Sequence, residues 1–435
     1  MASPLPQVLD TIPEAAGALG APAEPESRAT LIDALRGFAL FGVCLGNILT
    51  GFAWWTPTEH APVTSALQLP TDNLAYFLTH AFVDGKFYSI FSLLFGLGFA
   101  LQLTRRSDEP TALQLYRRRL RILMAIGFVH LALFWIGDIL LFYALLGFIL
   151  LRLRGTEDRR LLRWTVVLLL MPVLFALPKV ITPFATLGLP FFLPAEFVAR
   201  GFGFDLTSPT LITDIFIRGD LLTVMKGNVV GIFFRYGDLL DSGRPFKVLA
   251  MFLLGLLIGR HRAWERLDHF APLLRRVLAL GQVIGLPMSL GQAWVAGLPR
   301  ETTMGGWRVL LDSALYALGV VPLALAYAAA FVLLWRIPGW QGRLAFLAPT
   351  GRMALTNYLM QTLIGITLFY GIGFGLLGKV AYHHIWLLCI AFYTLQVLFS
   401  ALWMGRYQYG PAEWLWRQLS YGRRFPIRRA TESRM

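Results

Sequence analysis

Charged residues are scarce in this sequence. They make up 15% of its 435 residues, while hydrophobic residues make up 56%. A soluble domain usually has about a quarter of its residues charged, so the composition excludes a soluble globular protein. Apolar runs of about 20 residues are long enough to cross a bilayer. We therefore predict an all-α polytopic membrane protein.

Cysteine is rare as well, and the familiar catalytic signatures are missing. Cys44 and Cys389 both fall in apolar runs, which argues against a disulfide framework and a cysteine metal site. The sequence has no GxSxG turn, phosphate-binding loop, HExxH zinc motif or dinucleotide fingerprint. No permanently bound cofactor or metal is expected. The adjacent His383 and His384 are expected at the membrane interface.

About ten apolar segments are predicted to form membrane-crossing helices. They are Leu31–Ala53, Phe87–Leu103, Leu120–Trp135, Ile139–Leu151, Leu161–Val180, Phe246–Gly259, Val277–Val295, Val309–Leu334, Met353–Leu376 and Ile385–Met404. Residues 1–28, rich in Ala, Pro and Glu, lack the features of a signal peptide and are predicted to be disordered. The transmembrane domain then covers 29–421, and a basic cytoplasmic tail covers 422–435.

The positive charge has a regular place along the chain. The net charge is +14, but the arginines sit in short clusters between apolar runs, as around 105–121 and 152–163. The stretch from Trp54 to Gly85 has no Lys or Arg. This alternation follows the positive-inside rule. It favours lipid over nucleic acid as the partner and predicts a membrane protein with both termini in the cytoplasm.

One long segment, Lys179 to Lys247, mixes apolar patches with scattered charges. We expect an extracytoplasmic, lid-like segment near 180–245. The alternative is that "LLTVMKGNVVGIFF" enters the membrane as a re-entrant helix, which requires shielding of its backbone.

The first predicted span carries Asp33, Arg36 and Asn47. Helical periodicity places the three side chains on one stripe. Polar groups in a span usually face the bundle interior or a wet cavity, so the stripe is expected to line an internal path. The alternative is an N-cap at Asp33, snorkelling by Arg36 and helix-to-helix bonding by Asn47.

A second group lies in "RRRLRILMAIGFVHLALFWIGDILLFYALLGFILLRLR". His130 falls within a span and Asp138 at the short turn that follows it. Histidine exchanges protons near neutral pH, and a neighbouring carboxylate would fix its tautomer. The alternative is a histidine bonded to a backbone carbonyl, with Asp138 capping the next helix.

A third group lies in "PTGRMALTNYLMQTLIGITLFYGIGFGLLG". Arg352 begins this span, and Asn357 and Gln361 share a helix face. The glycines that follow favour close helix packing. Near the C-terminus, "YGPAEWLWRQLSYGRR" has the pattern of an interfacial anchor, in which Glu413 could close the inner mouth of a path.

These segments carry a family resemblance. "LIDALRGFALFGVCLGNI", "KFYSIFSLLFGLGF", "GRMALTNYLMQTLIGITLFY" and "GPAEWLWRQLSYG", with the His130 motif between them, resemble the YeiB family of bacterial inner-membrane proteins. That family is defined by a domain of unknown function.

The start of the chain, "LRGFA", is also distantly similar to the transmembrane acyltransferase superfamily, whose members move acyl groups from cytoplasmic acyl-CoA to acceptors across the membrane. One branch has a histidine at the position of Asn47. Another has asparagine there and a histidine in the next loop, where this chain has His60. We expect His130 to be catalytic because it lies within a span and in a family motif.

This resemblance implies acyl transfer through an internal tunnel. Arg36 and Arg352 would bind the phosphates of acyl-CoA as a co-substrate, with Asp33 orienting Arg36 and Asn357 assigned to the same site. His130, oriented by Asp138, would act as general base or carry the acyl group.

Asn47 would donate to the oxyanion. The acceptor would be extracytoplasmic or lipid-linked. The alternatives are a proton-coupled transporter or exporter using the same polar path, and a non-enzymatic membrane scaffold.

Overall fold

The computed structural model describes residues 30–53, 70–104, 109–182, 186–208, 210–297 and 306–429. Their regular structure is helical, apart from one isolated β-bridge that pairs Tyr407 with Arg428. The helices of the first half are α1 (Thr30–Gly46), η2 (Asn47–Ala53), α2 (Pro70–Leu78), η4 (Thr79–Val83), α3 (Lys86–Thr104), α4 (Glu109–Val129), η5 (His130–Phe134), α5 (Leu140–Leu153), α6 (Asp158–Ile181), α7 (Leu189–Gly201) and α8 (Leu211–Phe216).

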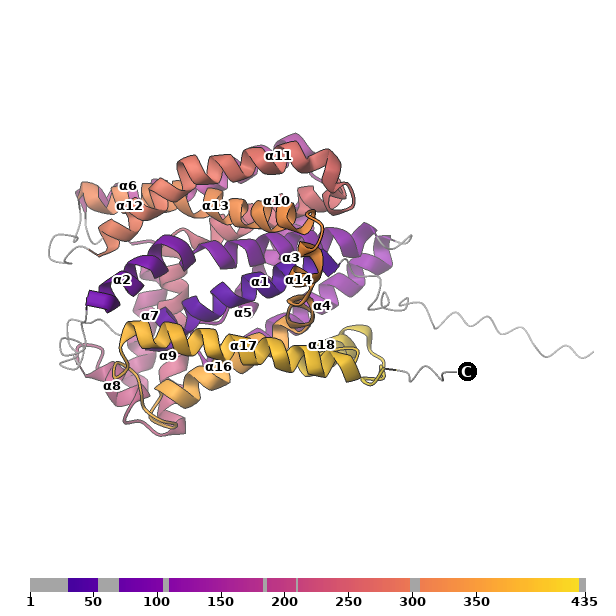
Figure 1. The fold of residues 1–435 in the computed structure, drawn as a ribbon. Coiled ribbons are helices and arrows are strands. Elements are labelled where there is room, and N and C mark those ends of the chain that lie inside the picture. The colour runs from indigo at the N-terminus through magenta and orange to yellow at the C-terminus, as the bar shows by residue number, and fades with distance from the viewer. Residues whose placement is uncertain are drawn as a thin grey trace, which may run out of the picture.

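The second half begins with two helices that meet at a sharp bend. Its helices are α9 (Leu221–Asp241), α10 (Arg244–Arg260), η6 (Ala263–Glu265), α11 (Leu267–Leu280), η7 (Gly281–Gly285), α12 (Leu286–Ala296), α13 (Trp307–Trp335), α14 (Trp340–Ala345), α15 (Ala348–Arg352), α16 (Ala354–Phe369), α17 (Tyr382–Arg406) and α18 (Pro411–Tyr421). Figure 1 shows them as one bundle, with α11 and α12 along one outer edge and α17 along the opposite one.

The predicted all-α membrane class is confirmed. Among the described residues, six helical stretches are long and apolar enough to cross a membrane, and a seventh results if α9 and α10 are counted as one broken span. The helices α5 and α16 are apolar but shorter. Large apolar side chains on outer helices, such as Leu170, Leu395 and Leu402, are exposed, as expected of surfaces that face lipid.

The centre of the bundle is the contact between α3 and α10. A Cβ atom on Gly96 would lie 2.0 Å from the Phe252 carbonyl oxygen, and one on Gly255 would lie 2.0 Å from that of Leu93. Each glycine therefore admits the backbone of the other helix, as small residues do in membrane bundles.

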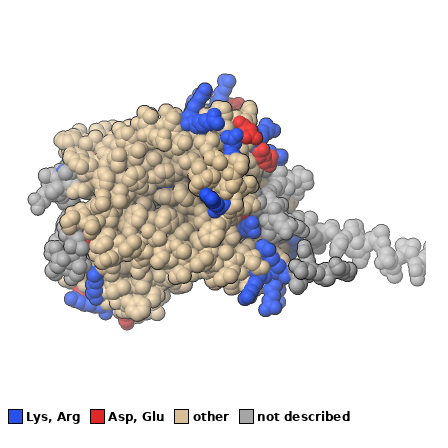
Figure 2. Space-filling model, in the orientation of Figure 1, with Lys and Arg blue, Asp and Glu red and all other residues tan. Residues whose placement is uncertain are grey.

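The two ends of the bundle differ in charge. Figure 2 shows Lys and Arg side chains gathered at the end that holds α18, and a middle surface largely without them. We call this the basic end. The arginines that define it are Arg119, Arg154, Arg260, Arg262 and Arg352.

The segment expected as a lid is helical, and its last part turns into the bundle. The axes of α9 and α10 differ by 68°, and Gly243 at the bend has φ +64°, a conformation that favours glycine. Lys179 at the end of α6 donates to Asp241 at 2.6 Å, which ties the bend to α6. This geometry fits either a broken span or a re-entrant loop.

Candidate functional site

An internal cavity of about 560 Å³ runs between the first helices of the chain. Its walls come mainly from α1, α3, α4, α5 and the start of α16. The volume lies within the range of small-molecule and cofactor sites, about 300–1,000 Å³. Most of its lining is apolar, while charged side chains collect at the basic end.

The charged mouth is organised by a buried carboxylate. Asp33 is 2% exposed, and its Oδ1 accepts a hydrogen bond from Arg36 at 2.7 Å, while Nε of Arg352 lies 3.4 Å from Oδ2. Gly351 makes this approach possible, because a Cβ there would lie 1.8 Å from the Asp33 carbonyl oxygen. Both arginines are about one fifth exposed and line the cavity. They therefore present positive charge to the space inside.

Helix α18 closes one side of the mouth. Glu413 accepts hydrogen bonds from the Leu355 and Thr356 backbone N–H groups at 2.6 and 3.1 Å and from the Thr356 hydroxyl at 2.5 Å. It thereby occupies the anion position at the N-terminus of α16. Burial raises the pKa of this carboxyl above its usual range, and the bonds from Thr356 offset part of that rise. Trp416 stacks on Arg119, whose guanidinium lies 4.4 Å from the ring centroid.

The mouth also contains a strained loop residue. Arg262, between α10 and η6, has φ +47°, a left-handed conformation that is uncommon for a residue other than glycine. Arg262 and Glu265 both line the cavity. The mouth thus combines cationic side chains from four separate parts of the chain.

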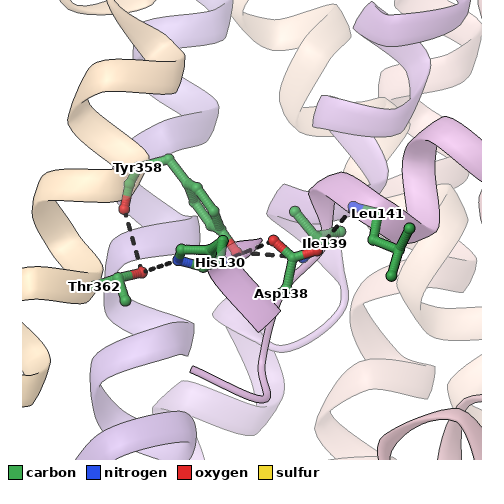
Figure 3. Close-up of polar contacts among 6 residues, drawn as sticks. All are labelled: His130, Asp138, Ile139, Leu141, Tyr358 and Thr362. Carbon is green, nitrogen blue, oxygen red and sulfur yellow. Dashed lines mark hydrogen bonds and ion pairs between the residues drawn. The ribbon is translucent and has the colours of Figure 1, made fainter. Parts of the chain in front are cut away.

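The second polar group is deeply buried, and Figure 3 shows its contacts. Nδ1 of His130 lies 2.7 Å from Oδ2 of Asp138, and Nε2 lies 3.0 Å from the Thr362 hydroxyl. His130 and Asp138 are each 3% exposed. The other oxygen of Asp138 accepts from the Leu141 N–H at 2.8 Å. One carboxylate therefore holds the imidazole and caps α5 at the same time.

The chain around His130 is shaped to make this contact. From His130 to Phe134 the helix widens into a π-turn, in which Trp135 N donates to the His130 carbonyl oxygen at 2.9 Å. Such turns are frequent at functional sites. The Trp135 ring stacks on Phe52 with centroids 4.4 Å apart. A Cβ on Gly137 would lie 2.1 Å from the same indole, so glycine is required for the turn that brings Asp138 back.

These contacts define how the imidazole can act. An ionised Asp138 can only accept, so Nδ1 carries the proton and Nε2 is left as the acceptor of the Thr362 hydroxyl. Tyr358 packs beside the imidazole with ring centroids 5.4 Å apart, and its hydroxyl oxygen accepts from Ile139 N–H at 3.3 Å. A base at Nε2 and a tyrosine O–H proton are thus available side by side.

Residues of the cavity wall contact the His130–Asp138 group. Tyr358, Ile139 and Tyr143 line the cavity at its inner part, and the first two of them contact His130 or the turn at Asp138. Helix α5 runs from this turn back to Arg154 at the basic end, about 20 Å at 1.5 Å per residue. His130 and Asp138 do not themselves line the cavity, and the pair touches its wall through Tyr358, at the end of α5 away from the mouth.

Other predicted site residues lie elsewhere. Asn47 continues the α1 stripe one turn beyond Val43, the last α1 residue that lines the cavity. Asn357 donates to Ser400 on α17 at 2.9 Å and does not line the cavity. His383, predicted at the interface, bonds Asp72 at 2.8 Å. His60 lies outside the described residues.

Three residues of the site were not predicted: Tyr358, Thr362 and Arg235. Thr362 lies on the same helix face as Tyr358, one turn apart, so the motif around Arg352 held a signal for both. Arg235 on α9 interacts electrostatically with Asp138 and Tyr358. Its only signal was a charged residue directly after "LLTVMKGNVVGIFF", the segment proposed as re-entrant.

The fold and site define a multi-pass helical membrane protein with a charged mouth, an apolar internal cavity and a buried histidine–aspartate pair. Residues 258–423 match a family described as a protein of unknown function, DUF418. The uncharacterized protein YxaH of Bacillus subtilis (strain 168) is 30% identical over 94% of this chain and 98% of its own length. The uncharacterized protein YeiB of Escherichia coli (strain K12) is 29% identical over 90% of this chain and 96% of its own.

The chain therefore belongs to this YeiB-like family, as its motifs predicted. No solved structure matches it.

Proposed function

We propose that this protein is an acyltransferase of the bacterial inner membrane, which moves an acyl group from cytoplasmic acyl-CoA to an acceptor hydroxyl or amine. The observation that carries the proposal is a cavity with a cationic mouth whose wall residue Tyr358 packs against the buried histidine base His130. An acyl-CoA has the matching form, with phosphates at one end of an apolar chain. The positive-inside rule puts the basic end in the cytoplasm, with ten crossings and both termini on that side.

The donor would bind at the mouth. Arg36 and Arg352, both held by Asp33, would pair with the phosphates through charge-assisted hydrogen bonds. The thioester would then lie in the cavity toward Tyr358. Because the cavity walls are apolar, they would exclude water from the thioester and disfavour hydrolysis.

His130 would act as the general base. Nε2 takes the proton of the acceptor group, whose oxygen or nitrogen bonds to the acyl carbon while the carbon–sulfur bond breaks. The proton then passes from Nε2 to the coenzyme A thiolate. Asp138 stabilises the imidazolium in between, and the Tyr358 O–H, which Ile139 N–H leaves free to donate, would stabilise the oxyanion.

A second candidate is a transporter that uses the same path. The 68° bend between α9 and α10 favours it, because broken helices beside a polar site are typical of transporters. The two candidates differ in whether a thioester is bound and consumed.

The test is the thermal stability of the detergent-purified full chain with acetyl-CoA, a long-chain acyl-CoA or coenzyme A. A ligand that binds the folded state raises its apparent stability. We expect a shift that is lost in Arg36→Ala and Arg352→Gln and kept in Arg218→Gln, which removes an exposed arginine paired with Asp214. Absence of a shift with every thioester would reject the enzyme and favour transport.

A further inference from the structure

A second set of cations lies far from the basic end. Arg235 on α9 and Arg244 and Lys247 on α10 flank the bend between these helices, and we call them the distal cationic group. Helix α10 ends at Arg260, which bonds Asp158 at 2.7 Å at the basic end. The 16 steps from Arg244 to Arg260 span about 24 Å. The distal group therefore lies on the other side of the bundle from the mouth.

Lys247 is buried, and no opposite charge among the described residues is bonded to it. It is 3% exposed and donates to the Tyr316 hydroxyl at 2.7 Å. Its ammonium lies 4.5 Å from the Tyr88 ring centroid and 4.1 Å from that of Tyr316. Asp84 acts on it electrostatically but forms no ion pair with it. Buried charges are normally paired, so this one has capacity for an anion.

Arg235 and Arg244 also have capacity to bind an anion. Arg244 lies 6.0 Å from the Tyr88 ring centroid and has no hydrogen bond or ion pair within the described part of the chain. Arg235 reaches Asp238 only at 4.0 Å, and that aspartate is 60% exposed. The buried Nε of Arg235 has no hydrogen-bond partner in the part of the chain that the structure describes.

The group borders the His130 site. The charges of Asp138, Tyr358 and Arg244 all act on Arg235. One turn before Arg235, a Cβ on Gly231 would lie 2.5 Å from Ile136, so α9 packs directly on the turn that leads to Asp138. Asn228 on the same stripe is fully buried, and neither atom of its amide has a partner.

From this geometry we propose that the distal cationic group binds the phosphate of the acceptor, a phosphate-bearing soluble or lipid molecule that enters opposite the donor. The inference rests on the proposed acyl transfer. Two guanidinium forks and one ammonium, contributed by α9 and α10, suit the several oxygens of a phosphate better than the two of a carboxylate. Donor and acceptor then approach from opposite faces and meet at His130.

The experiment measures thermal stability of the full chain with sn-glycerol 3-phosphate against glycerol, and in nanodiscs of phosphatidylglycerol against phosphatidylcholine. The variants are Arg235→Gln, Arg244→Gln and Arg244→Lys, with Arg352→Gln and Arg218→Gln as controls. We expect stabilisation by one phosphate probe. The half-maximal concentration should rise about tenfold or more in the Gln variants and much less in Arg244→Lys and both controls.

The different probes distinguish a soluble from a lipid source of the phosphate. They also test the anion site separately from the proposed acyl transfer. A response to glycerol phosphate supports a soluble acceptor, and a response to phosphatidylglycerol alone supports a lipid. A phosphate effect that needs Arg235 and Arg244, without any acyl-CoA effect, keeps the anion site and removes the acyltransferase. An acyl-CoA effect with no phosphate effect, or a phosphate effect unchanged in both Gln variants, overturns the anion site.

Discussion

His130 and Asp138 contact each other at 2.7 Å across a turn whose geometry depends on a π-helical segment and a glycine. The carboxylate also caps α5 through Leu141. The catalytic and the capping interpretations of Asp138 are therefore compatible, and substitutions have to be chosen so that they separate the two.

Asp138→Asn keeps an oxygen that can cap α5 but places an amide where Nδ1 needs an acceptor. We expect a folded protein whose imidazole adopts the wrong tautomer, with acyl transfer reduced about 10²- to 10⁴-fold. His130→Gln should lose transfer similarly. Both should keep the stability shift with acyl-CoA, measured beside transfer in the same preparation.

The matched control is His383→Gln. His383 forms a comparable pair with Asp72 at 2.8 Å between α17 and α2, whereas His130 packs on Tyr358 of the cavity wall. Its transfer rate should stay near that of the unchanged protein. Equal losses in His383→Gln and His130→Gln would show that histidine–carboxylate pairs here serve stability.

Asp33→Asn tests the mouth. The substitution removes the charge that holds Arg36 and Arg352, so donor affinity should fall about 10- to 100-fold, the effect of one charge-assisted hydrogen bond. The measurement is a coenzyme A titration followed by thermal shift. Asp268→Asn breaks an ion pair whose carboxylate is 96% exposed and should leave the titration unchanged. Unaltered coenzyme A affinity in Asp33→Asn would place the donor elsewhere.

Gly98→Leu tests whether the cavity accepts an acyl chain. Gly98 lines the cavity, and an added Cβ would meet nothing within 4 Å. A leucine there should fill cavity space, leave the fold intact and shift preference toward shorter acyl-CoA. The readout is the stability shift across a chain-length series. Gly405→Leu, also in open space but outside the cavity, is the control, and a parallel change in both variants would contradict the assignment.

The pH dependence of stability should carry a signature of Glu413. Its pKa in the folded protein is raised by burial. Above the ordinary carboxyl pKa, about 4.3, the unfolded chain therefore binds fewer protons at this site than the folded protein. The free energy of unfolding should then fall as pH rises from that value through the folded-state pKa, and become flat above it. Denaturant unfolding from pH 4 to 8 should show this decline in the unchanged protein but not in Glu413→Gln.

The sequence predicts some of this site well, for physical reasons. His130 and Asp138 are eight residues apart in one motif, and a short turn leaves them few arrangements. The pairing of Asp33 with Arg352 joins distant parts of the chain, and no local pattern indicates it. Only their shared place near predicted span ends suggested one site.

The misplaced residues show the limit of periodicity. Asn357 and Gln361 do share a face, as their spacing predicts, but that face bonds Ser400 and Gln396 on α17. Helical spacing determines which residues face together, while tertiary packing determines what they face. Arg235 was missed because α9 gave no clear assignment as membrane or loop.

Because of the π-turn at His130, the site depends on the number of residues between His130 and Asp138. A π-turn holds one residue more than an α-turn between bonded groups. Deleting a residue from Leu131 to Phe134 would remove the residue that this wider turn accommodates and shorten the link between His130 and Asp138, which would carry Asp138 away from the imidazole. Conservative substitutions in these four positions would be tolerated, whereas a single-codon deletion would not. Relatives that keep the histidine–aspartate pair are then expected to keep the spacing of eight between them.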